Sequence, residues 1–263
     1  MSQAAFLGLA ASLLAGAMTG IGGLLVAASG PPDPRRQNLL IGFAAGVMIA
    51  AAMFSLILPA WHRMLGGGAS PAFAALAVLA AVCLGALAMG RLGVFAEALA
   101  AGGRLPDRLG AALGVADERR VALFALAITL HNLPEGAAVG ISFMGGDAAL
   151  GWATALGIGL QNIPEGMAVA ALLASLGWSR TRSTLAALAS GLVEPLGGAL
   201  AVTLAGVSAA MLPWALGFAA GAMLFVVVSE IIPHTRRQIA HGSATPALMA
   251  GLALMMVLDV TLS

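Results

Sequence analysis

Apolar stretches of about twenty residues recur along the whole chain, and they constrain its fold more than any other feature. A helix of that length crosses the hydrocarbon core of a bilayer, which is about 30 Å thick. Charged residues make up 9% of the 263 residues, whereas soluble domains carry about 25%. The short alternating segments of a membrane barrel do not occur in the sequence. We therefore predict an all-α polytopic membrane protein, a single transmembrane domain over residues 1–263 with eight spans near residues 4–29, 39–60, 71–90, 121–144, 150–176, 183–207, 212–233 and 245–262.

Arginine is distributed unequally among the predicted loops. Of the 12 basic residues, all but Arg63 would lie in the loops after the first, third, fifth and seventh spans. Loops rich in basic residues face the cytoplasm. We therefore expect both termini outside the cell and a cytoplasmic loop at about residues 91–120. The net charge of +1 gives no indication of a nucleic-acid partner.

Two short motifs occur twice. HNLPEG at residues 131–136 is repeated as QNIPEG at residues 161–166, and GFAAGVM at residues 42–48 is repeated as GFAAGAM at residues 217–223. A proline follows each GFAAG copy at a similar distance. In the predicted topology the two members of each pair run in opposite directions across the membrane. This pattern indicates an inverted repeat, in which the substrate site lies near the midplane at the repeat interface.

Each Pro-Glu-Gly motif places polar groups near the middle of its span. On a helix, the first and fifth residues of each motif share one face, which gives two pairs, His131 with Glu135 and Gln161 with Glu165. The asparagines that follow the first residues, Asn132 and Asn162, lie about 100° round the helix. The prolines remove a helical N–H donor, so a carbonyl oxygen is left near each motif.

Three glutamates at mid-membrane depth require neutralisation. Glu135 and Glu165 are joined by Glu194, which also precedes a proline. A charged carboxylate at this depth costs a few kcal/mol or more, and no arginine occurs in these spans. Protons or a metal ion must compensate. One imidazole, three carboxylates and several amide oxygens suit a divalent transition metal such as Zn²⁺ or Fe²⁺.

Two other functions compete with metal transport. The carboxylates would also serve a proton-coupled carrier of a small organic solute. A membrane metalloenzyme would need one ion with an open position, but the sequence contains neither HExxH nor GxSxG, and we assign no catalytic residue.

HNLPEG, QNIPEG and the Glu194-Pro195 pair resemble the ZIP (Zrt/Irt-like protein) family of divalent-metal transporters, in particular its prokaryotic GufA-like branch. The resemblance covers the whole chain. It implies transport of Zn²⁺ first, and of Cd²⁺, Fe²⁺ or Mn²⁺ as further candidates, across the inner membrane into the cytoplasm. It also implies a homodimer in the lipid bilayer, periplasmic termini, and elevator-type alternating access in which spans 2, 4, 5 and 7 move past spans 1, 3, 6 and 8. The metal is then the substrate, and no cofactor is expected.

The resemblance also implies two sets of metal ligands. One ion would be bound by Met48, His131, Gln161 and Glu165, and a neighbouring ion by Asn132, Glu135, Asn162 and Glu194, with Glu135 and Glu165 able to bridge. Some relatives have aspartate at the position of Asn162 and histidine at that of Gln161, which predicts weaker binding here.

Further polar residues lie toward the ends of the spans. An exit path would use Glu230, His234 and His241, for which simple loop polarity is the alternative explanation. An entrance would use His62 and Asp259.

Overall fold

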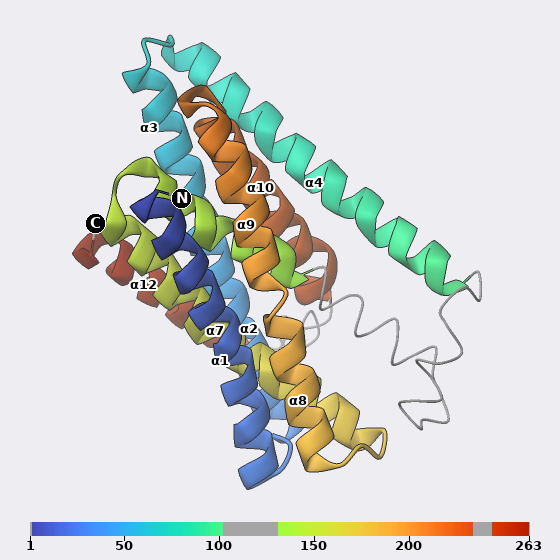
Figure 1. The fold of residues 1–263 in the computed structure, drawn as a ribbon. Helices are drawn as coiled ribbons and strands as arrows, with labels where there is room; N and C mark the ends of the chain where they lie inside the picture. Colours follow the sequence, from blue (N-terminus) through green and yellow to red (C-terminus); the bar gives the residue numbers. More distant parts are fainter. Residues whose placement is uncertain (1, 102–130, 234–243, 263) are drawn as a thin grey trace.

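The computed structural model describes residues 2–101, 131–233 and 244–262, and these ranges are helical throughout, with short turns between helices and no strand. Seven helices in the described residues are long and apolar enough to span a membrane, which confirms the predicted class of fold. Of the expected span at residues 121–144, the structure describes a helix at residues 131–142. The elements follow in the order α1 (Gln3–Ser29), α2 (Pro34–Ala50), η1 (Ala51–Ile57), α3 (Leu58–Gly66), α4 (Pro71–Ala101), residues 131–142, η2 (Phe143–Gly145), α7 (Ala148–Ser175), α8 (Arg180–Gly191), α9 (Glu194–Val207), η3 (Ala209–Met211), α10 (Leu212–Val226), η4 (Val227–Ile231) and α12 (Thr245–Leu262). In the view of Figure 1, the start of α1 and the end of α12 both lie in the upper left part of the picture.

The third helix is longer than predicted. The sequence analysis ended this span at residue 90, but α4 continues to Ala101. The added residues, RLGVFAEALAA, are mostly alanine, leucine, arginine and glutamate, which favour helix. The first part of the expected cytoplasmic loop is therefore helical, and its remainder lies outside the described residues.

Both copies of the GFAAG motif lead into a π-helical segment. At the end of η1, the N–H of Leu58 donates to the carbonyl of Met53, and at the end of η4 the N–H of Ile232 donates to that of Val227. Each bond spans five residues rather than four, as in a π-helix. A proline follows each segment within two residues, and its missing N–H interrupts the α-helical ladder. The two halves of the chain thus share the same local irregularity as well as the same motif.

The helix pair α2 and α12 packs through glycines in the same way as the pair α10 and α4. A methyl group on Gly46 of α2 would overlap the carbonyl oxygen of Leu248, and one on its repeat equivalent Gly221 of α10 would overlap that of Val82. The contacts are reciprocal, with Gly251 against Phe43 and Gly85 against Phe218. Small residues allow helix backbones to approach this closely. The inverted repeat therefore includes α4 and α12.

The same relation holds for the helices that carry the Pro-Glu-Gly motifs. A methyl group on Gly136 would overlap the carbonyl oxygen of Glu194 in α9, and one on Gly166 would overlap that of Thr19 in α1. Glu194 and Thr19 are therefore equivalent positions of the two halves. The repeat pairs α1 with α8 and α9, and residues 131–142 with α7.

These close backbone contacts divide the described helices into two groups. We name α1, residues 131–142, α7, α8 and α9 the motif bundle, and α2 to α4, α10, η4 and α12 the flanking bundle; in Figure 1, α4 lies along α10 at one edge of the molecule. Where a described glycine of one bundle faces the other bundle, its nearest neighbours there are side-chain atoms. Gly157 of the motif bundle, for example, lies against the side chains of Met255 and Val47 in the flanking bundle. This grouping differs from the expected division into spans 2, 4, 5, 7 and spans 1, 3, 6, 8. The division into two bundles is defined by contacts between helices that are far apart in the sequence, so the sequence alone did not indicate it.

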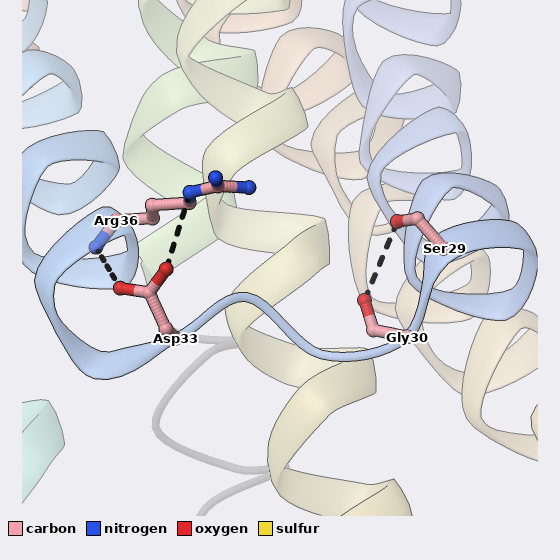
Figure 2. A network of polar contacts seen from close by, with 4 residues as sticks. All are labelled: Ser29, Gly30, Asp33 and Arg36. Carbon is pink, nitrogen blue, oxygen red and sulfur yellow. Dashed lines mark hydrogen bonds and ion pairs between the residues drawn. The ribbon is translucent and has the colours of Figure 1, made fainter.

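A short loop that ends in a helix cap joins α1 to α2. It is one of the arginine-containing loops that the sequence analysis expects on the cytoplasmic side. Asp33 caps α2, accepting a hydrogen bond from the backbone N–H of Arg36 (2.9 Å) and pairing with its Nε (3.1 Å), as Figure 2 shows. Ser29 donates to the carbonyl of Gly30 (3.4 Å), where φ of +84° ends α1. The exposed ion pair contributes little stability, whereas the cap fixes the start of α2.

Candidate metal-ion site

Three helices of the motif bundle bring the predicted polar residues together. Residues 131–142 carry the first motif, α7 continues through Pro164 and carries the second, and α9 begins at Glu194. Five of the predicted ligands are fully buried, namely Asn132, Glu135, Gln161, Asn162 and Glu194. A polar cluster enclosed to this degree inside a membrane protein is a candidate functional site.

Two amide side chains connect the carboxyl groups. The Nε2 of Gln161 donates to Oε1 of Glu135 (2.5 Å). The Nδ2 of Asn162 donates to Oε1 of Glu194 (2.6 Å) and also to the backbone carbonyl of Ala15 in α1 (2.8 Å). Hydrogen bonds to carboxylates are short and strong. These bonds join residues 131–142, α7, α9 and α1 at one level.

The charges in the cluster interact directly. Glu135, Glu165 and Glu194 lie close enough together to repel one another when they are ionised. His131 is the nearby group that attracts Glu165. Water is excluded from the buried members of the cluster, so these interactions are much stronger than in solvent. Positive charge is needed to hold the carboxylates together.

Several buried oxygen atoms of the cluster have no hydrogen-bond partner among the described residues. They are Oδ1 of Asn132 and of Asn162, Oε1 of Gln161, and Oε2 of Glu135 and of Glu194. Each such atom costs about 1–3 kcal/mol when it is buried unpaired. A divalent cation accepts lone pairs from oxygen and would satisfy several of them at once. The donor set therefore fits a metal ion.

The amide oxygens are needed to complete such a site. Among the described residues, no three side chains of the His, Cys, Asp or Glu type form a group that could hold a metal ion by themselves. Asn132 and Gln161 can add neutral oxygen ligands, and neither amide atom of Asn132 is hydrogen-bonded within the part of the chain that the structure describes. Met48 lies in α2 of the flanking bundle, 1% exposed within the main apolar core, and stays a predicted ligand.

The predicted entrance residues lie in one hollow. His62 and Asp259 line a cavity of about 460 Å³ together with Arg63 and Asp147. Asp259 accepts a hydrogen bond from Ser55 (2.9 Å). Arg63 crosses from the flanking bundle to donate to the carbonyl of Gly145 (2.9 Å).

Sequence reasoning did not find Asp147. This residue caps α7, accepting from the backbone N–H groups of Ala149 and Leu150. An aspartate directly before an apolar helical run is a recognisable cap signal, but the pattern does not indicate that it borders a cavity.

The predicted exit residues are placed only in part. Glu230 belongs to η4, and only its backbone is described. His234 and His241 lie outside the described residues. The exit path therefore stays a prediction.

Comparison with known proteins identifies the family of the chain. The sequence pattern of the family described as "ZIP Zinc transporter" matches residues 112–259, more than half of the chain and all of both motifs. The chain belongs to the ZIP family. It is 42% identical to the zinc transporter GufA of Myxococcus xanthus over 255 residues, covering 97% of this chain and 98% of that protein. It is also 43% identical to the zinc transporter ZIPB of Bordetella bronchiseptica over 251 residues, covering 94% of this chain and 78% of that protein.

More distant ZIP proteins align over nearly the same length. The human zinc transporter ZIP11 is 32% identical over an alignment of 322 positions that covers 93% of this chain and 94% of the human protein. Membership of the ZIP family makes the chain a multi-pass transporter of divalent metal ions and not an enzyme. The metalloenzyme and the organic-solute carrier are thereby set aside.

Proposed function

We propose that this ZIP protein carries Zn²⁺ across the inner membrane into the cytoplasm and that the ion binds at the cluster formed by the two Pro-Glu-Gly motifs. The set of buried oxygens without hydrogen-bond partners supports this proposal most directly, because they gather where three carboxylates repel one another. The names of the relatives, which are zinc transporters, support zinc as the ion. Cd²⁺, Fe²⁺ and Mn²⁺ are further candidate substrates.

The ligand types favour a borderline divalent cation. Carboxylates of Glu135 and Glu165, the imidazole of His131 and the amide oxygen of Gln161 combine nitrogen and oxygen donors, which suits Zn²⁺. The thioether of Met48 would add a soft donor that favours Cd²⁺ and Zn²⁺ over Mg²⁺ or Ca²⁺. Metal binding at these groups would displace protons, because each ligand binds in its deprotonated form.

The two bundles support an elevator-type movement. The carboxylates of the cluster all belong to the motif bundle, whose helices are joined by backbone contacts at glycines such as Gly136 and Gly166. The flanking bundle reaches these helices and the turn that follows them through flexible side chains: Met255 contacts Gly157, and Arg63 contacts Gly145. The motif bundle would therefore move as one body and carry the ion away from Met48. The homodimer and the periplasmic termini stay expectations from the family.

Influx into proteoliposomes tests this function. The purified chain is reconstituted with a metal-sensitive dye inside, and Zn²⁺ and Cd²⁺ uptake is compared among wild type, His131→Ala and Glu165→Ala. Thr203→Ala is the matched control, because Thr203 is exposed on α9 and bonds only within its own helix in the described contacts. Saturable uptake that is lost in both site variants and kept in the control is expected. Folded wild type without uptake, or uptake unchanged in both variants, would contradict the proposal.

A further inference from the structure

Gln161 and Asn162 are neighbours in α7, and both donate to a carboxyl group, but they are anchored differently. The amide nitrogen of Asn162 has two oxygen acceptors, Glu194 Oε1 and the carbonyl of Ala15. The amide nitrogen of Gln161 donates to Glu135 Oε1. This difference determines which amide can turn its oxygen toward a cation.

Asn162 is fixed as a donor. A backbone carbonyl can only accept hydrogen bonds, so the amide atom that faces Ala15 must be nitrogen. Turning the amide by 180° would place its oxygen against the carbonyl oxygen of Ala15 and the carboxyl oxygen of Glu194. Both new contacts would be repulsive in a buried environment. The side chain of Asn162 therefore points its N–H group toward Glu194. A cation bound between these two residues would need an oxygen of Asn162 at that position.

Gln161 has no such backbone anchor among the contacts described above. Its Oε1 is buried without a hydrogen-bond partner. A turn of the terminal amide exchanges nitrogen and oxygen, and the oxygen then faces the same ion as Glu135. The cost is one hydrogen bond, which the metal–oxygen bonds replace.

The inverted repeat supplies an internal comparison. Asn132 is the equivalent of Asn162, and Thr19 is the equivalent of Glu194. Asn132 is fully buried, and neither atom of its amide is hydrogen-bonded within the described residues. The double anchor is thus specific to Asn162 and does not follow from the repeated motif.

We infer that Asn162 is a positioning residue that holds Glu194 by a hydrogen bond in place of a second cation, so that the protein binds one divalent ion per chain. The ion is centred on Glu135, Gln161 and Glu165. This inference rests on the proposed function and decides between the one-ion and two-ion sites that the family resemblance allows. Glu194 of α9 then accepts a hydrogen bond from Asn162 and is not a metal ligand.

Counting bound ions tests the inference without measuring transport. The full chain, purified in detergent, is dialysed to equilibrium against Cd²⁺, and the metal is measured by elemental analysis. Wild type is expected to bind one ion per chain. Asn162→Asp replaces the donor with a second carboxylate opposite Glu194, so it is expected to bind two ions. The double variant Asn162→Asp with Glu194→Gln should return to one.

The single variant Glu194→Gln provides a comparison in which the hydrogen bond that supports the fold is kept. Its amide oxygen still accepts the hydrogen bond from Asn162, so the count is expected to stay at one. Two ions in wild type, a loss of one ion in Glu194→Gln, or a folded Asn162→Asp that keeps one ion would overturn the inference and leave the proposed function standing. A folded wild type that binds no Cd²⁺ would overturn both. A purely structural role of Asn162 would lower the melting temperature of Asn162→Asp without changing the ion count.

Discussion

Gly16 of α1 and Gly191 of α8 lie backbone against backbone, so that a methyl group on either would overlap the carbonyl oxygen of the other. The two residues are equivalent positions of the inverted repeat, because each precedes its partner, Thr19 or Glu194, by three residues. The two halves of the motif bundle therefore meet at this pair. The contact holds α8 and α9, and with them Glu194, against α1.

Gly16→Ala is expected to destabilise the protein, because the added methyl group forces α1 and α8 apart. Overpacking of this kind costs about 1–3 kcal/mol. Thermal unfolding of the purified protein, followed by size-exclusion chromatography, measures the effect. Gly206→Ala is the control, since nothing lies within 4 Å of a methyl group at that position of α9. Equal melting temperatures of the two variants would contradict the packing described here.

A disulfide between the bundles is expected to block transport, and one within a bundle is not. In a Cys83→Ala background, Val47→Cys with Gly157→Cys joins α2 to α7, where a Cβ on Gly157 lies 3.6 Å from Cγ1 of Val47. Oxidation should nearly abolish Cd²⁺ uptake, and reduction should restore it, because the motif bundle can no longer move.

The control for this disulfide joins two helices of the flanking bundle. Gly42→Cys with Ala244→Cys links α2 to the residue before α12, where a Cβ on Gly42 lies 3.4 Å from the Cβ of Ala244. That spacing is close to the usual value of about 3.8 Å for a disulfide. Full uptake with the inter-bundle disulfide formed would exclude an elevator movement of these bundles.

Asp259→Asn is expected to raise the KM for Cd²⁺ with little change in kcat. The carboxylate lies in the hollow with His62 and Asp147, where negative charge increases the local concentration of cations. An effect of roughly tenfold at low salt, falling as salt is added, is the expected magnitude. The asparagine keeps an oxygen that can accept the hydrogen bond from Ser55. A KM that does not depend on salt in wild type would count against an entrance at this hollow.

Metal binding is expected to release protons, and uptake is expected to weaken as the outside becomes more acidic. The sign follows because protons and Cd²⁺ compete for the same carboxylates and imidazole. Calorimetric titration of Cd²⁺ in two buffers with different heats of ionisation gives the number of protons released. Binding heats that are the same in both buffers would contradict the competition.

The sequence predicted the class of a helical membrane protein correctly, because burial in lipid requires long uninterrupted apolar runs. The limits of α1, α7 and α12 lie within two residues of the predicted spans. The cluster was also predictable. A glutamate such as Glu194 is costly at mid-membrane depth, and together with the two motifs it indicated a cation site. The structure places it beside Asn162 of the second motif.

Other features depend on contacts between distant residues, which the sequence does not record. The division into two bundles follows from glycine contacts such as that between Gly16 and Gly191. The anchor between Asn162 and Ala15 joins residues 147 positions apart and uses a backbone carbonyl, which has no sequence signature. The extension of α4 to Ala101 was missed because Arg91 and the arginines after it were assigned to a cytoplasmic loop.

A divalent cation is expected to bind among the oxygens of the two Pro-Glu-Gly motifs. Crystals of the full chain grown with Cd²⁺ test this most directly, because anomalous scattering locates the ion without reference to the ligands. An anomalous peak is expected at coordination distance from carboxylate oxygens of Glu135 and Glu165, and it should be lost in Glu135→Gln. A peak confined to the outer hollow near Asp259, with none at the motifs, would contradict the claim.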